Sequence, residues 1–414
     1  MKYFIVACGL FGFSILGLRK LLTRDMVDFQ VLFSGASVYA NEGNPYLRSA
    51  MREAINFLPD MELGMQLTLP GLFLLIRPIA GFSLETATYI WASMNLLAIL
   101  CSLLLTAKLA RIPTGSTIFC VFVTMGLFLG PFHTAIWLGN TDILALAFTV
   151  SSIYVLERRD HQLSSGLILG IGMILKIHSA GLFAFYFLAR GKITFFIVAM
   201  TTWISANLIA AISLSFNSPS WFQTWKTTVE SSENDYNKVV STNLDIGELI
   251  HLKAGIFGLF GNAFWSGMAA LAICVVLLCL VLLLVFRRST IQEMPVRRFA
   301  EYSAISAIGL LIVYHKFYGA VFLIFPIAWA LLLIKERTSA AFGYVTLLAL
   351  SVSVLNGQVL YTILASKGQL PTFVTKTFIG TGILQFHFVW VQLAVLSIII
   401  FSLYKSSNSH AIQG

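Results

Sequence analysis

Two carboxylates lie where the chain enters apolar stretches. Asp28 precedes residues 29–40, which carry no charge and are rich in Phe, Val and Leu, and Asp142 follows Gly139 and Asn140 at the start of an apolar run. A carboxylate at the boundary between water and lipid can take a proton from a substrate hydroxyl. An acid inside a membrane span is costly and suggests a function. The alternative is that each carboxylate caps a helix, because aspartate favours the free amides of a helix N-terminus.

Cations lie at two other breaks between apolar runs. Lys176 and His178 separate two short runs, and His315 and Lys316 precede Tyr318. An anionic phosphate would be a good ligand for such pairs, although a single lysine can also extend its side chain to the interface. With the two carboxylates, these cations predict a site for a phosphorylated, hydroxyl-rich substrate.

The elements that position these residues are expected to be membrane helices. Hydrophobic residues make up 58% of the 414 residues, and charged residues make up 11%, against roughly 25% in soluble domains. Since one span needs about 20 apolar residues, we predict an all-α polytopic bundle of about twelve transmembrane helices with short interfacial or re-entrant helices. A soluble enzyme, a nucleic-acid module and a disordered protein are excluded. The net charge of +9 is typical of cytoplasmic loops and predicts no nucleic-acid partner.

The charges alternate in sign along the chain. Basic breaks between apolar runs are typical of the cytoplasmic side, and they occur at 108–111, 158–159, 190–192, 287–298 and 335–337. The breaks between them have few or balanced charges and are predicted to lie outside. They contain His133, Lys176, His178, His315 and Lys316.

We expect one integral-membrane domain over residues 1–414. Segments 23–65 and 217–252 hold 11 of the 18 acidic residues and are predicted to be outer loops, the first with an interfacial helix. Run 66–82 is short and interrupted by Pro and Gly, which predicts a re-entrant element. The alternative topology flips the first span and places 23–65 in the cytoplasm.

These motifs resemble those of GT-C class membrane glycosyltransferases of family 87. The run from Asp28 to Tyr46 is similar to the family's first-loop motif, which begins with an Asp and ends in Pro-Tyr. Gly139–Asp142 is similar to a Gly-Gln-x-Asn motif, with Asn and Asp in place of Gln and Asn. The stretch 163–176 is similar to a Gly-rich helix that ends in Lys-Pro, without the Pro. Residues 315–318 are similar to a His-bearing junction late in the family.

The resemblance implies a hexosyltransferase. The family contains α-1,2-mannosyltransferases that use polyprenol-phosphate-mannose, so a polyprenyl-phosphate donor, with mannose as the expected sugar, and a glycan or glycolipid acceptor are implied. Asp28 matches the family's catalytic base, which acts with inversion. The cations would hold the donor phosphate without a metal or cofactor: Lys176, His178, His315 and Lys316. The other polar residues of these motifs are expected to bind substrate: Asp25, Tyr39, Asn44, Tyr46, His133, Asn140 and Asp142.

The expected place of action is the outer face of a bacterial inner membrane, in the synthesis of a cell-envelope glycan. Two other functions remain open. A polymerase or ligase of lipid-linked glycans would use a diphosphate donor. A non-catalytic transporter would place its charged residues around a cavity at the membrane midplane rather than at the outer ends of spans.

Overall fold

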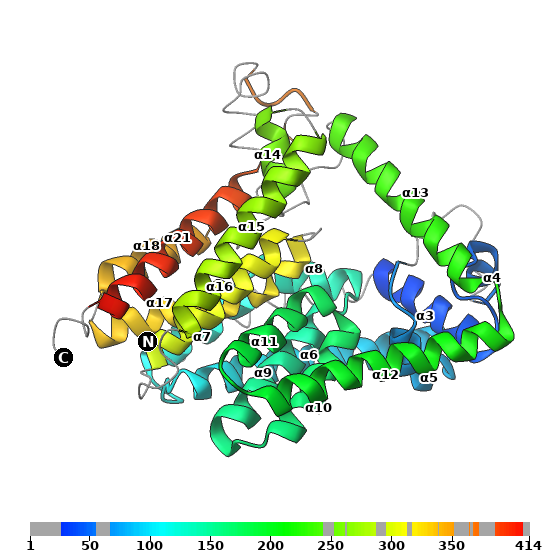
Figure 1. The fold of residues 1–414 in the computed structure, drawn as a ribbon, viewed down its shortest axis with the longest axis horizontal. Coiled ribbons are helices and arrows are strands. Elements are labelled where there is room, and N and C mark those ends of the chain that lie inside the picture. The colour runs from blue at the N-terminus through cyan, green and yellow to red at the C-terminus, as the bar shows by residue number, and fades with distance from the viewer. Residues whose placement is uncertain are drawn as a thin grey trace.

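A computed structural model of the protein shows a bundle of α-helices (Figure 1). The structure describes residues 26–54, 67–242, 252–260, 263–286, 295–312, 317–337, 339–351, 364, 367–371 and 386–408. Within these ranges there is no strand, which confirms the predicted all-α polytopic fold. The expected first span, Asp25, His315 and Lys316 lie outside the described residues.

In chain order the helices are α3 (Val27–Ala40), α4 (Arg48–Ala54), α5 (Gly71–Ala80), α6 (Leu84–Leu109), α7 (Thr117–Phe128), α8 (Gly130–Leu138), α9 (Asp142–Arg159), α10 (Gln162–Leu175), α11 (Ile177–Ala189), α12 (Ile193–Asn217), α13 (Trp221–Thr242), α14 (Leu252–Phe260), α15 (Ala263–Phe286), α16 (Pro295–Ile312), the 3-10 helix η3 (Phe317–Leu323), α17 (Ile324–Glu336), α18 (Ala340–Ser351) and α21 (His387–Asn408).

Several of these helices are long and apolar enough to cross a membrane. In the described chain there are five such elements, α6, α12, α15, η3 with α17, and α21, and a sixth if α7 and α8 form one span bent by 45°. The expected count of about twelve includes runs outside the described residues and stays a prediction.

The basic breaks of the sequence meet at one end of the bundle. Arg158 Nη2 donates a 2.8 Å hydrogen bond to the Lys108 carbonyl, and Lys335 Nζ donates a 3.1 Å bond to the Arg111 carbonyl. We call this the basic end. Two of the breaks with few charges, 133–140 and 176–178, meet at Asn140, at the opposite end of α9. We call this the site end. For these described breaks, the grouping by charge agrees with the prediction, and the side of the membrane on which each end lies stays a prediction.

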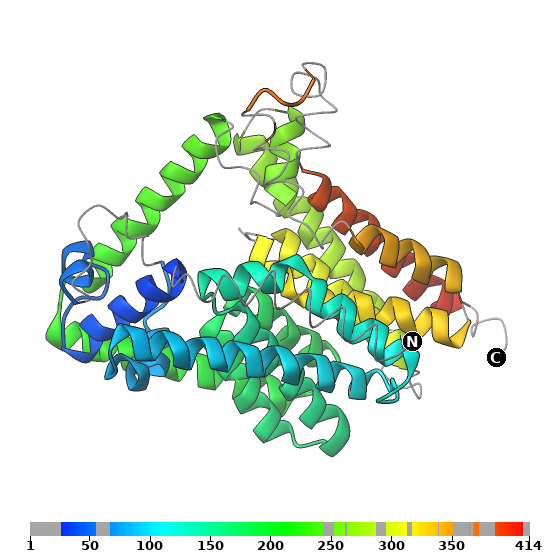
Figure 2. The same ribbon diagram turned by 180° about the vertical axis from the view of Figure 1, so that it is seen from behind.

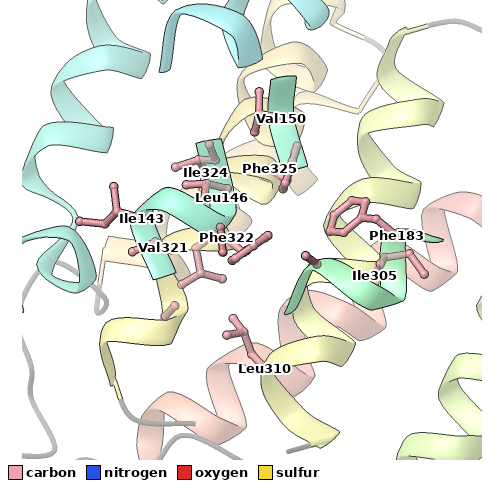
Figure 3. Packing of buried hydrophobic residues seen from close by; sticks show 14 of the residues in the cluster. Ile143, Leu146, Val150, Phe183, Ile305, Leu310, Val321, Phe322, Ile324 and Phe325 are labelled. Carbon is pink, nitrogen blue, oxygen red and sulfur yellow. The ribbon is translucent and has the colours of Figure 1, made fainter. Parts of the chain in front are cut away.

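An apolar core joins the helices that hold the site end. Figure 3 shows its side chains, which come from α9, α11, α16, η3 and α17. Phe183 of α11 lies 5.5 Å from Phe325 of α17 between ring centroids, and both are fully buried. Ile143, in the first turn of α9, is also fully buried. The core thus fixes the start of α9 relative to α11 and η3.

The polar segment 23–65, which we call the first polar segment, contains the buried helix α3. α3 ends at Ala40, and residues 31–39 are all buried. Tyr39 stacks on Phe73 of α5 at 5.9 Å. Other parts of the protein therefore cover most of this helix, and its predicted position along the membrane surface stays a prediction.

The run 66–82 contains only the short helix α5. Its 10 residues extend about 15 Å, which is too short for a hydrocarbon core of about 30 Å. The Gly71 amide donates a 3.0 Å hydrogen bond to Asn207 Oδ1 of α12. This helix cannot cross the membrane alone, and the re-entrant position of the run stays a prediction.

Most of the polar segment 217–252, which we call the second polar segment, forms the helix α13. The sequence patterns did not predict this helix. In Figures 1 and 2 it stands away from the bundle, between the end near α4 and the end near α14. Its first turn is anchored, because the Trp221 ring stacks on Tyr46 at 6.1 Å. The helix therefore connects the first polar segment with the second half of the chain.

Helices α10 and α12 pack closely through two glycines. A Cβ atom at Gly166 would lie 2.8 Å from the Phe195 carbonyl oxygen, and one at Gly170 would lie 2.5 Å from Thr202 Cβ. Small residues four positions apart let two membrane helices approach each other. This contact fixes the C-terminal end of α10, where Lys176 follows.

We expect Gly170→Ala to lower the thermal unfolding temperature of the detergent-purified protein, because the added methyl group must push α12 away. Overpacking of this kind costs roughly 1–3 kcal/mol. The matched control is Gly267→Ala in α15, where the nearest atom to the added Cβ is the flexible Lys253 Cε at 3.6 Å. Equal unfolding temperatures for the two variants would contradict the close contact.

Candidate active site

The side chain of Asp28 is held by an amide from a distant helix junction. Asp28 lies in the first turn of α3, and its Oδ2 accepts a 2.7 Å hydrogen bond from Asn140 Nδ2. The N-cap position of α3 is Met26, and no side chain caps this end, so the helix-cap interpretation of Asp28 is wrong. No described residue forms a hydrogen bond with the other oxygen, Oδ1. The carboxylate is thus oriented while one oxygen stays available for a proton.

A buried ion pair lies beside this hydrogen bond. Lys176 Nζ is 3.1 Å from Asp142 Oδ2, and the Asp142 side chain is fully buried. Thr141 occupies the N-cap position of α9, so the cap interpretation of Asp142 is also wrong. The Lys176 side chain is 18% exposed, which shows that it points into the protein and does not extend to the interface.

The amide of Asn140 connects the two acids and the lysine. Its Oδ1 accepts a 3.4 Å hydrogen bond from Lys176 Nζ and a 3.1 Å bond from the Asp142 backbone amide, while its Nδ2 donates to Asp28. An amide has a donor end and an acceptor end, and here both ends have matching partners. Asn140 therefore has one favourable orientation, which sets the orientation of Asp28.

The turn between α8 and α9 places Asn140 against α3. Gly139 has φ +69°, and a Cβ there would lie 2.6 Å from Phe29 Cβ. Trp91 Nε1 donates a 2.7 Å hydrogen bond to the Gly139 carbonyl, and its ring stacks on Phe29 at 5.0 Å. Only glycine allows both the left-handed backbone and this close approach.

The break between α10 and α11 places Lys176, as the sequence predicted. The Lys176 amide donates to the Gly172 carbonyl at 2.9 Å, and the Lys176 carbonyl accepts from the Ala180 amide at 3.1 Å. Lys176 thus ends one helix and begins the next. Its ammonium lies 5.5 Å from the centroid of the Tyr318 ring in η3, a residue that the sequence-predicted site did not include.

Two other predicted substrate residues anchor the first polar segment. Asn44 Nδ2 donates to Thr224 Oγ1 at 3.2 Å, and Asn44 Oδ1 accepts from the Tyr46 amide at 3.0 Å. The Tyr46 hydroxyl donates to the Thr68 carbonyl at 3.0 Å. Burial raises the pKa of this phenol above its usual value, so it stays a neutral donor. These contacts are internal, and a role of either side chain in substrate binding stays a prediction.

The remaining predicted residues have different surroundings. His133 is buried in α8, with Nε2 at 2.7 Å from the Leu127 carbonyl, and Tyr39 packs on Phe73. His178 is the second residue of α11 and lies close to the charge of Lys176. Neither His133 nor Tyr39 has a recorded contact with Asp28, so their roles in binding stay predictions.

The three charged side chains described at the site, Asp28, Asp142 and Lys176, would not attract a phosphate by themselves. Asp28 and Asp142 interact electrostatically, and with Lys176 they have a net charge of −1. A phosphate at this place would need further cations. The described residues hold no group of three His, Cys, Asp or Glu side chains that could bind a metal ion.

Comparison with protein families decides the class of this protein. The model of glycosyltransferase family 87 matches residues 70–314, more than half of the chain. The chain belongs to glycosyltransferase family 87. It is therefore a membrane glycosyltransferase with a sugar donor and an acceptor, which speaks against the transporter alternative. No curated protein and no solved structure matches it significantly.

The matched range of family 87 begins after Asp28. It includes Asn140, Asp142, Lys176 and His178. The hydrogen bond between Asn140 and Asp28 connects the first polar segment to the matched helices. The structure thereby adds Asp28 to the site independently of the family match.

We expect Lys176→Met to destabilise the glycosyltransferase strongly, because it leaves the buried Asp142 carboxylate unpaired. Removal of one partner of a buried pair costs about 3–5 kcal/mol. The double variant with Asp142→Asn should lose less stability than the sum of the two single variants, as measured by thermal unfolding in detergent.

The control for this comparison of single and double variants is the pair of Lys192 and Asp160. Their charged atoms are 2.8 Å apart, and their side chains are 35% and 71% exposed. The corresponding substitutions there should cost at most about 1 kcal/mol. Additive losses at Lys176 and Asp142 would show that the two groups do not stabilise each other.

Proposed function

We propose that this family 87 enzyme transfers a hexose, with mannose as the expected sugar, from a polyprenyl-phosphate donor to a hydroxyl of a glycan or lipid-linked acceptor. One integral-membrane domain over the whole chain carries out the reaction. The observation that supports this proposal most directly is the Asp28 carboxylate, oriented by Asn140 at 2.7 Å beside the cation of Lys176.

Asp28 acts as the general base of the proposed transfer. Its Oδ1 takes the proton of the acceptor hydroxyl, and the acceptor oxygen attacks the anomeric carbon in line with the departing phosphate. The bond from the anomeric carbon to the phosphate oxygen breaks, and its electron pair leaves with polyprenyl phosphate. One displacement of this kind inverts the anomeric centre.

Cations at the α10–α11 and α16–η3 junctions stabilise the leaving phosphate. Lys176 is in part exposed and lies over Tyr318. His178, the second residue of α11, can donate a hydrogen bond to the phosphate from its imidazole ring. His315 and Lys316 directly precede Phe317, where η3 begins. In this proposal they supply the positive charge that Asp28, Asp142 and Lys176 together lack. Positive groups placed where negative charge develops lower the barrier. The proposed reaction uses no metal or other cofactor.

The site end faces the outside of a bacterial plasma membrane in this proposal. The support is the separation of charges, because arginines and lysines from several loops meet at the opposite, basic end. Basic loops are retained on the cytoplasmic side. The lipid tail of the donor enters from the bilayer, and the product belongs to a cell-envelope glycan.

A donor screen with purified enzyme tests the function. We expect transfer from a polyprenyl-phosphate hexose, with mannose preferred, and little from a polyprenyl-diphosphate glycan, as measured by product mass. Transfer from the diphosphate donor alone would instead identify a polymerase or ligase of lipid-linked glycans. Asp28→Asn should keep the unfolding temperature but lower kcat by at least about 10²-fold, the usual contribution of a general base.

The matched control for Asp28→Asn is Glu42→Gln, since Glu42 is an exposed carboxylate in the same polar segment. It should transfer at the rate of the unmodified enzyme. Unchanged turnover by Asp28→Asn would remove Asp28 from the role of base.

We expect Asn140→Asp to move the acidic limb of the pH–rate profile to higher pH, by about one unit. A second carboxylate beside Asp28 disfavours the ionised base, because like charges repel at this distance. Asn41→Asp, at the other end of α3, is the control and should leave the profile unchanged. An unchanged profile for Asn140→Asp would show that Asn140 does not act through Asp28.

A further inference from the structure

A small cavity lies at the basic end, far along α9 from Asp28. It has a volume of about 50 Å³ and lies between the ends of α6, α9 and α16. Its polar lining consists of Arg111, Arg158, Arg298, Glu157 and Tyr302. We call it the arginine pocket. Three guanidinium groups against one carboxylate give the lining a net charge of +2.

The single acid of the arginine pocket is already satisfied by its neighbours. Glu157 Oε1 accepts a 3.0 Å hydrogen bond from the Tyr302 hydroxyl, and Oε2 forms an ion pair with Arg298 Nη1. Glu157 therefore cannot neutralise the other two arginines. The excess charge of the pocket resides on Arg111 and Arg158.

These two arginines retain donors for a ligand. Arg158 uses Nη2 for the Lys108 carbonyl, and a guanidinium has five N–H donors. The backbone of Arg111 is fixed, with φ 51° and its carbonyl bound to Lys335 Nζ. The Arg111 side chain forms no hydrogen bond or ion pair with any described residue.

A buried polar cluster holds the wall of the arginine pocket in place. The fully buried Glu301 of α16 accepts a 2.7 Å hydrogen bond from the Tyr186 hydroxyl of α11, and Arg297 Nε lies 3.2 Å from its Oε1. Arg190 Nη1 lies 3.9 Å from Glu301 Oε2. These bonds tie α11 to α16 next to Arg298 and Tyr302, so the α16 wall of the arginine pocket is held in place.

We propose that the arginine pocket binds a phosphate-bearing anion, such as the headgroup of an anionic phospholipid. A phosphate carries one or two negative charges, which matches the net charge of the pocket, and guanidinium groups bind its oxygens two at a time. Basic pockets between membrane helices on the cytoplasmic side are suited to such headgroups. This site is separate from the donor phosphate at the site end.

The test compares two pairs of arginines in lipid nanodiscs. The pocket variant is Arg111→Gln with Arg158→Gln. The control variant is Arg159→Gln with Arg337→Gln, which removes the same charge from the same end. The match extends to the backbone, because Arg111 and Arg337 both have positive φ. Arg159 is the neighbour of Arg158 in the sequence, and all four arginines are exposed.

Native mass spectrometry measures the retention of phosphatidylglycerol against phosphatidylcholine. We expect the unmodified enzyme and the control variant to retain phosphatidylglycerol, and the pocket variant to bind it about tenfold or more weakly, since each basic residue near the surface contributes to the attraction. Equal retention by the pocket and control variants would overturn the proposal.

A second arm identifies the source of the phosphate. Inorganic phosphate is added to phosphatidylcholine nanodiscs, and the unfolding temperature is measured, since a ligand that binds the folded state raises it. A rise that requires Arg111 and Arg158 supports a site for the phosphate group alone, whereas a rise only with phosphatidylglycerol supports the lipid headgroup. No dependence on these arginines in either arm contradicts the proposal.

Sugar transfer in phosphatidylcholine nanodiscs shows whether each variant is folded. If the pocket variant does not fold, Arg111→Lys with Arg158→Lys replaces it. This variant keeps the charge but loses the paired N–H donors, and we expect it to bind phosphatidylglycerol less well than the unmodified enzyme. Retention equal to that of the unmodified enzyme would then overturn a site built for phosphate.

Discussion

The side-chain amide of Asn140 is the contact on which the site depends. Its acceptor end faces Lys176 and the amide of Asp142, so its donor end must face Asp28. A rotation by 180° would place the carbonyl oxygen against the carboxylate and the amino group against the ammonium, and both contacts would be unfavourable. The orientation of the proposed base is thus set by Asn140, which is held in turn by the first residue of α9 and by Lys176 at the break between α10 and α11. Gly139 makes this possible, because any side chain there would hold α3 away.

The buried pair of Asp142 and Lys176 serves this arrangement at an energetic cost. Both charges lose water, and their attraction repays the loss only when the geometry is good. An apolar pair of the same size could stabilise the helices as well. It could not, however, donate to Asn140 or supply a cation near a leaving group. The ion pair is therefore consistent with a role in the geometry of the site rather than in the stability of the fold.

The sequence predicted the parts of this site that depend on local patterns. The break at Lys176 and the grouping of basic loops follow from periodicity and charge, and the structure confirms both. The contact between Asp28 and Asn140 could not be predicted, because 112 residues separate them and capping aspartates occur at the same positions as functional ones. A role of Asn44 and Tyr46 in substrate binding stays a prediction, because their hydrogen bonds are to other parts of the protein and no local pattern distinguishes polar residues with internal partners from those that bind substrate. The helix α13 was missed because a charged, polar segment resembles a loop.

The two polar ends of the enzyme are joined by helices that behave as rigid rods. α9 begins at Asp142 and has Glu157 and Arg158 in its last turn, and its 18 residues extend about 27 Å. Its inward side chains are fully buried in the core shown in Figure 3. A densely packed interior does not deform continuously, so a ligand in the arginine pocket cannot easily displace Asp142 alone. An anion there would stabilise the whole bundle by binding its folded form, and its distance from the proposed base Asp28 would stay unchanged.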